Sequence, residues 1–321
     1  MSTPLEDEEI TLNEDDFDDV PPSSARLGMR ASTISTVTYT EDDFLEAPAA
    51  SRDAGRSSML STDSAPMRPS RRSTMQLMPF HFRPMILLFG DSLTQQGYGE
   101  NGEVGWASLL TSAYQRRADV FNRGFSGYNT NHALSIAQKQ FGKVDEGVLF
   151  VTVWWGANDA AVPSSPQHVP EDDYQTNLKF ILARLRASLG RRLNFPLLLL
   201  TPPPVDEQAL CRAFEIEQPD RTNERARLYG DLVKKVAEED SSGDRVAVID
   251  TWKVLEGDTE ERGKYLSDGL HLNGAGNTKV FEALMETIQT RFPDLAPMVD
   301  GDGKYGTTGI PMEEKLWTEL L

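Results

Sequence analysis

Short apolar runs alternate with longer stretches of helical periodicity from Met85 onward, and this alternation restricts the fold more than any other feature of the sequence. Apolar strands separated by helices are typical of a parallel sheet that is covered on both faces. Strands are expected at Met85–Phe89, Asp119–Asn122, Val148–Trp154, Pro196–Leu200 and Val246–Ile249. The sequence therefore predicts a three-layer α/β/α sandwich around a five-stranded parallel sheet, with right-handed crossovers.

Helices fill the intervals between these strands and follow the last of them. They are expected at Gly105–Arg117, Thr130–Phe141, Tyr174–Leu189, Arg221–Glu239 and Gly274–Arg291. In folds of this class, ligands bind beyond the carboxyl ends of the strands. The residues that follow each strand are therefore the first place to look for chemistry.

The first 80 residues differ in composition from the rest of the chain. Residues 1–50 hold thirteen Asp or Glu against two Arg, which accounts for −11 of the net charge of −18. Acidic blocks between Ser-, Thr- and Pro-rich stretches bury too little apolar surface to offset chain entropy. We expect a disordered tail over residues 1–80, a folded domain over 84–292 and a C-terminal extension over 293–321, whose packing the sequence leaves open.

The stretch Arg68–Thr74, RPSRRST, reverses the charge of the tail. It is interpreted as a target for a kinase or another regulatory partner, as an electrostatic latch for the acidic blocks, or as a solvated linker. The solvated linker is the simplest of these interpretations, and the sequence leaves all three open.

Composition also bears on partners and compartment. The acidic balance argues against nucleic acid as a partner, because phosphate backbones need clustered Lys and Arg. No apolar run approaches the roughly 20 residues of a membrane span. The first residues lack the basic start and apolar segment of a secretory signal, and the single cysteine, Cys211, fits a reducing compartment. These features predict a cytoplasmic protein without a membrane span.

Four short polar motifs lie where the predicted fold binds ligands. Gly90–Thr94, Gly124–Tyr128 and Gly156–Asp159 follow the first three strands, and Asp268–His271 lies between the fifth strand and the last helix. Because the carboxyl ends of parallel strands meet at one edge of the sheet, we expect the four motifs to form one site.

Ser92 is the candidate nucleophile of this site, and a serine hydroxyl attacks only when a base removes its proton. Of the four histidines, only His271 has a carboxylate placed to orient it, because Asp268 lies three residues earlier. Asp268 would hold one ring nitrogen and leave the other free to act as base. The simpler interpretations are a helix cap for Ser92 and a structural role for His271.

Ester hydrolysis also needs hydrogen-bond donors for the negative charge that develops on the carbonyl oxygen. The Ser92 N–H is one candidate, Gly127 offers an N–H with no side chain in the way, and Asn158 offers a side-chain amide. A tight turn for Gly127 and a cap for Asn158 are the simpler interpretations. With the triad, these donors complete the set of groups that acyl transfer requires.

The motifs GDSLT, GFSGYNT, GAND and DGLHLN resemble, in order, the four signature blocks of the SGNH/GDSL hydrolase superfamily. NRGFSGYNT, GANDA, TPPP and LSDGLHLN extend the likeness to its isoamyl acetate-hydrolysing esterase-like branch, over residues 84–292. The resemblance implies a flavodoxin-like SGNH fold and a serine esterase for small, acetate-type esters, with no metal and no cofactor. The site residues that it implies are the triad Ser92, Asp268 and His271 and the oxyanion hole Ser92, Gly127 and Asn158.

Several alternatives remain beside this interpretation. The same fold would suit a hydrolase of lipid, sugar or thioesters, or a catalytically silent protein that binds partners. Gly97–Gly102 spells a dinucleotide-binding G-x-G-x-x-G but does not directly follow a strand. Asp91, Asn158, Asp159 and His271 would be the ligands of a metallophosphoesterase, which normally uses more histidines. Gly124–Gly127 only approximates the G-x-S-x-G elbow of an α/β-hydrolase.

Overall fold

The computed structural model describes residues 83–140, 147–189, 195–240, 243–297 and 309–310. The tail expected over residues 1–80, with its basic stretch Arg68–Thr74, lies outside these ranges. Its disorder and its regulatory role therefore stay predictions. None of the helices in the described ranges combines the length and the apolar character that crossing a bilayer requires.

Five strands form one parallel sheet in the order β2-β1-β3-β4-β5. Their bounds are Met85–Gly90 for β1, Asp119–Gly124 for β2, Val148–Trp154 for β3, Leu197–Leu200 for β4 and Val246–Ile249 for β5. All five lie within two residues of the ranges expected from the apolar runs. The predicted three-layer α/β/α fold with a five-stranded parallel sheet is confirmed.

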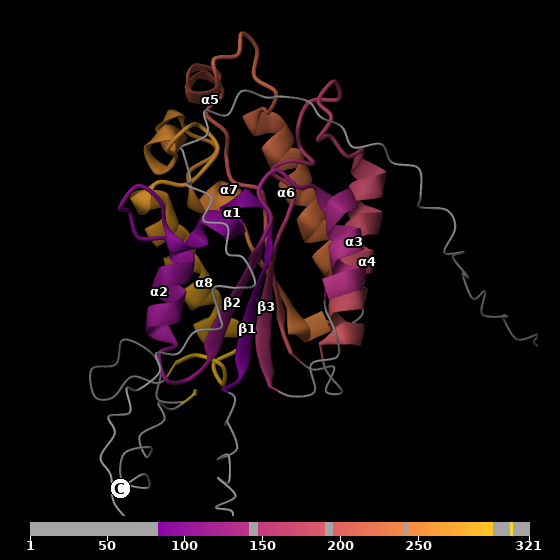
Figure 1. The fold of residues 1–321 in the computed structure, drawn as a ribbon, viewed down its shortest axis with the longest axis vertical. Helices are drawn as coiled ribbons and strands as arrows, with labels where there is room; N and C mark the ends of the chain where they lie inside the picture. The colour runs from indigo at the N-terminus through magenta and orange to yellow at the C-terminus, as the bar shows by residue number, and fades with distance from the viewer. Residues whose placement is uncertain (1–82, 141–146, 190–194, 241–242, 298–308, 311–321) are drawn as a thin grey trace, which may run out of the picture. The chain divides into compact units, whose positions relative to one another are not determined.

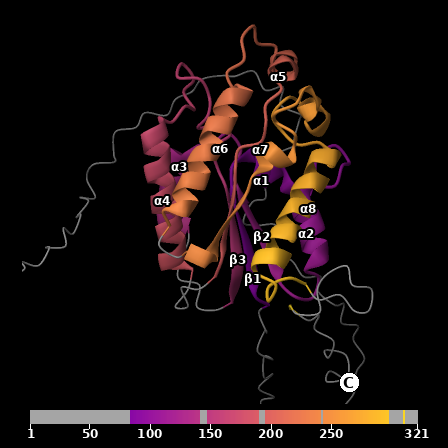
Figure 2. The same ribbon diagram turned by 180° about the vertical axis from the view of Figure 1, so that it is seen from behind.

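Helices cover both faces of this sheet. The α-helices are α1 Ser92–Gln95, α2 Trp106–Ala113, α3 Thr130–Gln140, α4 Glu171–Ser188, α5 Glu207–Phe214, α6 Asn223–Glu238, α7 Thr251–Val254 and α8 Gly274–Arg291, and the 3-10 helices are η3 Gln96–Tyr98, η4 Gly243–Arg245 and η5 Glu260–Tyr265. Figure 1 shows α2 and α8 on one side of the sheet and α3 and α4 on the other. Figure 2 shows the same layers from behind, with α6 beside α4.

Three helix ends differ from the sequence expectation by two or more residues. The helix expected from Tyr174 begins at Glu171, because three acidic residues in its first turn interact favourably with the helix dipole. The helix expected to reach Arg117 ends at Ala113, and Arg116 adopts a left-handed conformation with φ 57° that a helix does not accept. The helix expected from Arg221 begins at Asn223, because the Thr222 side chain caps it and accepts from the Arg225 N–H.

The two apolar cores lie on opposite faces of the sheet, and β1, the second strand in its order, contributes side chains to both. Ile86 and Leu88 belong to the core beneath α2 and α8, whereas Leu87 and Phe89 belong to the core beneath α3, α4 and α6. In this strand order the chain leaves β1 towards β2 at one side and returns to β3 at the other. The carboxyl ends of β1 and β3 therefore flank the topological switch point, where open α/β sheets bind their ligands.

The described part of the C-terminal extension packs on this domain. Ala296 is buried, the Tyr114 hydroxyl donates to Leu295 O at 2.8 Å, and the Arg117 side chain donates to Ile310 O at 3.1 Å. Residues 311–321, which hold the amphipathic EEKLWTELL, lie outside the described ranges. The domain contacts therefore continue past the expected boundary at residue 292.

Candidate active site

Ser92 is the first residue of α1. Figure 1 shows α1 at the carboxyl end of β1. The Asp91 carboxylate caps this helix and accepts from the Leu93 N–H at 3.0 Å. A Cβ on Gly90 would lie 2.4 Å from Trp154 O, so only glycine lets the end of β1 approach β3 this closely. As the first helical residue, Ser92 has no intrahelical acceptor for its own N–H.

His271 lies between Ser92 and Asp268. Its Nε2 is 2.9 Å from Ser92 Oγ, and its Nδ1 is 2.7 Å from Asp268 Oδ2. Asp268 Oδ1 also accepts from the backbone N–H groups of Leu270 at 2.9 Å and His271 at 2.8 Å. The three residues chosen from separate motifs therefore form one hydrogen-bonded row.

Asp268 stays ionised in this row. Its partial burial acts to raise its pKa, but the hydrogen bond and charge of His271, together with the two backbone N–H groups, lower that pKa to about 2. A carboxylate that is charged at neutral pH favours a proton on the facing ring nitrogen, His271 Nδ1. This leaves Nε2 to accept a proton from Ser92 Oγ.

The loop that carries His271 does not follow β5 directly, because α7 and η5 intervene. The loop is closed on itself by the Ser267 N–H, which donates to His271 O at 2.8 Å. It is tied to the segment after β4 by the Asp206 N–H, which donates to Gly269 O at 2.9 Å. The position of the histidine thus depends on the segment around residue 206.

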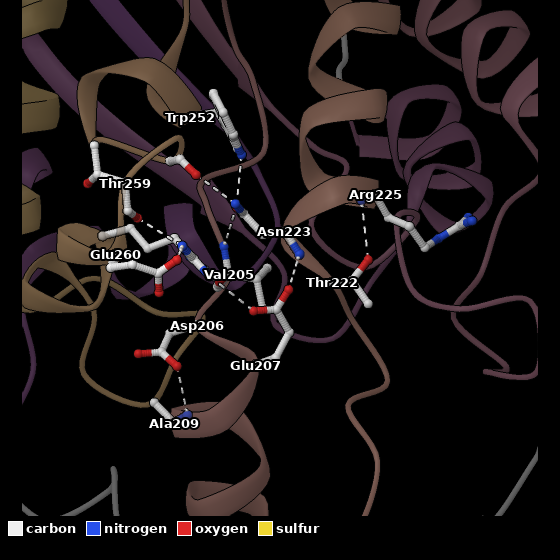
Figure 3. A network of polar contacts seen from close by, with 12 residues as sticks. Val205, Asp206, Glu207, Ala209, Thr222, Asn223, Arg225, Trp252, Thr259 and Glu260 are labelled. Carbon is white, nitrogen blue, oxygen red and sulfur yellow. Dashed lines mark hydrogen bonds and ion pairs between the residues drawn. The ribbon is translucent and has the colours of Figure 1, made fainter.

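A polar network holds that segment in place (Figure 3). Asn223 Oδ1 accepts from the Val205 N–H at 3.2 Å and from Trp252 Nε1 at 2.8 Å. Its backbone N–H donates to Glu207 Oε1 at 2.7 Å, and Arg262 Nε donates to Val205 O at 2.9 Å. The network joins the start of α6, α7 and η5 around the segment that holds the histidine loop.

The three candidate oxyanion donors lie in three different motifs. Within the described part of the chain, no hydrogen bond uses the N–H of Ser92 or of Gly127. Gly127 has φ +79°, a left-handed conformation that glycine adopts without strain. Asn158 is buried, and its Nδ2 donates one N–H to Tyr128 O at 2.8 Å. The second N–H of the amide has no hydrogen-bond partner among the described residues and can donate to an oxyanion.

Two buried carboxyls lie beneath these motifs. Burial raises the pKa of Asp91 to about 7, although the Leu93 N–H opposes the shift and the charge of Asp159 adds to it. Burial raises the pKa of Asp159 to about 6, against the hydrogen bonds from Thr130. Among the described residues, Oδ2 of each carboxyl is without a hydrogen-bond partner. Asp91 therefore holds a proton for part of the time at neutral pH, whereas Asp159 takes one up only nearer pH 6.

The raised pKa of Asp91 makes stability depend on pH. Between about pH 4 and pH 7 the folded protein holds a proton on Asp91 that the unfolded chain has lost, so stability falls as pH rises through this window. Asp91→Asn keeps a favourable helix cap and removes the titration. We expect the variant to melt above the wild type at pH 8 and level with it at pH 4. A melting-temperature difference that is the same at both pH values would contradict this.

The other sequence candidates do not join the row. Of the residues proposed as metal ligands, Asp91 caps α1, Asp159 holds Thr130, and His271 faces Ser92. Within the ranges that the structure describes, no three His, Cys, Asp or Glu side chains gather as a metal site. Gly97–Gly102 leads from η3 to a loop whose Glu103 side chain accepts from the Gly274 N–H at 2.5 Å, so this loop contacts the start of α8.

Comparison with known proteins identifies the class. A model of the GDSL-like lipase/acylhydrolase family matches residues 88–279, which include all four motifs. The chain belongs to this family, and the predicted SGNH/GDSL resemblance is confirmed. It is accordingly a carboxylic ester hydrolase.

Two named relatives and one solved structure show which proteins the chain is similar to. The chain is 38% identical over 218 residues to a GDSL esterase/lipase of Arabidopsis thaliana, covering 64% of this chain and 86% of the relative. It is 35% identical over 218 residues to the isoamyl acetate-hydrolyzing esterase 1 homolog of Mus musculus, covering 66% and 84%. The solved structure of a lipase/acylhydrolase from Enterococcus faecalis matches 67% of this chain and 99% of that chain, with 21% identity and a TM-score of 0.49.

Proposed function

We propose that this chain is a serine esterase that hydrolyses small carboxylic esters, acetate esters in particular, through an acyl-enzyme on Ser92. The observation that carries the proposal is the row Ser92 Oγ, His271 Nε2, His271 Nδ1 and Asp268 Oδ2, with links of 2.9 and 2.7 Å. Both distances lie within hydrogen-bond reach, as a nucleophile, its base and an orienting carboxylate require.

In the acylation step, Ser92 Oγ attacks the ester carbonyl carbon while His271 Nε2 takes the hydroxyl proton. The carbonyl oxygen becomes an oxyanion that accepts from the Ser92 N–H, the Gly127 N–H and the free N–H of Asn158. The tetrahedral intermediate collapses, the bond to the alcohol oxygen breaks, and His271 returns its proton to that oxygen. The alcohol leaves, and the acyl group stays on Ser92 as an ester.

In the deacylation step, His271 Nε2 takes a proton from water, and the oxygen of that water attacks the acyl carbon. The second oxyanion forms in the same site. Its collapse breaks the bond to Ser92 Oγ, which recovers its proton from His271, and the carboxylic acid is released. Asp268 stays ionised throughout and stabilises the imidazolium that forms in each step.

The acetate preference rests on the relatives named for isoamyl acetate hydrolysis. A panel of p-nitrophenyl acetate, butyrate and octanoate, with isoamyl acetate beside them, tests it. We expect kcat/KM to be highest for the acetates and to fall as the acyl chain lengthens. A maximum of kcat/KM at octanoate would contradict the small-ester proposal and favour a lipid ester as the substrate.

We place the activity in the cytoplasm as part of this proposal. The single cysteine, Cys211, precludes an intrachain disulfide, which fits a reducing compartment.

The role proposed for Asn158 predicts a selective loss of turnover. A donor that tightens only as charge develops contributes to kcat and little to KM. We expect Asn158→Ala to lower kcat by roughly 10²- to 10³-fold, the cost of one lost oxyanion donor. Asn158→Asp, which places a carboxylate beside the oxyanion, should be at least as damaging.

The melting temperature of the same two variants distinguishes a catalytic role of Asn158 from a purely structural one. If Asn158 served only as a structural contact between motifs, the alanine variant would lose about 1 kcal/mol of stability and keep its kcat. A destabilised Asn158→Ala enzyme with near-normal turnover would remove Asn158 from the oxyanion hole and leave Ser92, His271 and Asp268 in place.

A further inference from the structure

Arg221 is a buried cation that lies outside the four motifs, two residues before α6. Its guanidinium donates to Ala157 O at 3.1 Å, to Asp220 Oδ2 at 2.6 Å and to Asn158 Oδ1 at 2.9 Å, and it also donates to the side-chain oxygen of Gln167. Burying a cation costs free energy unless such partners offset it. Two of these partners, Ala157 and Asn158, belong to the Gly156–Asp159 motif of the proposed oxyanion hole.

Gln167 joins this cation to both motifs. Its Nε2 donates to Gly127 O at 2.7 Å and to Asn158 Oδ1 at 3.1 Å. Its own backbone is held by Asn129, whose Nδ2 donates to Gln167 O at 3.0 Å. One side-chain amide therefore touches both Gly127 and Asn158, which belong to loops after different strands.

The direction of these hydrogen bonds fixes the orientation of both amides. Arginine can only donate, so the atom of Gln167 that faces Arg221 is Oε1, and Nε2 faces Gly127 O. Asn158 then meets two donors, from Arg221 and Gln167, at a single atom, which must be its oxygen. The Asn158 NH₂ group is held on the opposite side, where one of its N–H groups has no hydrogen-bond partner among the described residues.

We propose that Arg221 and Gln167 are positioning residues of the oxyanion hole, and this rests on the function proposed above for Asn158. Together they lock the Asn158 amide with its NH₂ group outward and hold the Gly127 turn against it. A charge-assisted hydrogen bond to Asn158 Oδ1 also polarises the amide and makes its N–H a stronger donor. The positive charge of the Arg221 guanidinium behind the amide also attracts the negative charge that develops on the oxyanion.

A double-mutant cycle tests this inference, with kcat, KM and melting temperature measured for wild type, Arg221→Met, Asn158→Ala and the double variant. Partners that orient a functional side chain account for roughly 10- to 100-fold in affinity or activity at metal sites. We expect a fall in kcat of about tenfold or more for Arg221→Met, with KM little changed. In the Asn158→Ala background, Arg221→Met should cost clearly less kcat than it does in the wild type, because the main group on which Arg221 acts is gone.

Arg225 provides a matched control. Its Nε donates to Ala160 O at 2.9 Å and to Ala161 O at 3.1 Å, so it anchors the same loop without touching Asn158 or Gly127. We expect Arg225→Met to lower the melting temperature and to leave kcat within about twofold of wild type. An equal loss of kcat in both arginine variants would reduce Arg221 to loop anchoring and overturn the inference.

The other outcomes are equally decisive. If Arg221→Met kept the kcat of the wild type while Asn158→Ala lost turnover, the inference would be overturned and the proposed function would stand. The same holds if the losses of kcat in the two single variants simply add in the double variant. Normal kcat for Asn158→Ala would remove both the proposed donor and its positioning residues. If Arg221→Met does not fold, Gln167→Ala on the loop takes its place, and a kcat equal to wild type in that variant overturns the inference.

Discussion

Replacing Ser92 by alanine should lower kcat for ester hydrolysis by about 10⁴-fold or more, with the fold retained. In the proposed mechanism the hydroxyl oxygen of Ser92 forms the acyl bond, and this oxygen lies 2.9 Å from His271 Nε2. The Asp91 cap of α1 does not involve the Ser92 side chain, so the variant should fold as the wild type does. Initial rates with p-nitrophenyl acetate and a thermal melt measure both quantities.

Ser126 is the matched control for this change. It lies in the stretch Gly124–Gly127 that approximates a G-x-S-x-G elbow, and its backbone N–H donates to Gln95 Oε1 at 2.8 Å. No histidine ring in the described residues is hydrogen-bonded to its hydroxyl. We expect Ser126→Ala to keep most of the activity. If Ser92→Ala kept substantial activity and Ser126→Ala lost it, the nucleophile would be Ser126 of the second motif and not Ser92.

Replacing His271 by alanine should be comparably damaging, again about 10⁴-fold in kcat, because among the described residues no other base is hydrogen-bonded to Ser92 Oγ. Asp268→Asn should cost less than this, since Asp268 orients the ring and stabilises its charge without taking up the proton. The expected order of kcat is wild type, then Asp268→Asn, then His271→Ala. Both variants are measured beside the wild type with the acetate substrate at neutral pH, where the pKa of about 2 keeps the Asp268 carboxylate of the wild type charged.

His168 provides the control for the histidine change. Its Nδ1 lies 3.2 Å from Asp159 O and 3.3 Å from the Arg225 guanidinium, and no hydrogen bond links it to Ser92 or Asp268. His168→Ala should therefore leave kcat close to that of wild type. If the loss in His271→Ala were no larger than the loss in His168→Ala, His271 would not be the base.

The sheet and the hydrogen-bonded row of Ser92, His271 and Asp268 were predictable because their signals are local. Each strand is a short apolar run, as in Val148–Trp154, and its burial on both faces explains why the run is continuous. Ser92 follows such a run directly, and Asp268 stands one turn before His271. Once parallel strands are assumed, the edge of the sheet explains the position of Ser92, whereas the loop of Asp268 and His271 is held there by the segment around residue 206.

The residues that support the site were not predictable in the same way. Arg221 reaches Asn158 across 63 positions and Gln167 across 54. The helical periodicity predicted Arg221 as the first residue of α6. The Thr222 cap instead begins the helix after Arg221, whose side chain packs behind the GAND motif. Asn223 likewise looked like an ordinary helix residue, although its partners lie in three other segments. Contacts of this kind follow from how loops pack and leave no periodic trace in the sequence.

The central claim is that Ser92 carries the acyl group during turnover, and active-site labelling tests it most directly. The full-length chain is treated with a fluorophosphonate that reacts with activated serines, and the modified residue is located by peptide mass spectrometry. Our account predicts that labelling abolishes esterase activity, falls on Ser92, and is lost in His271→Ala, where no base activates the hydroxyl. Full inactivation with the label on another serine, or labelling of Ser92 that proceeds equally well without His271, would contradict it.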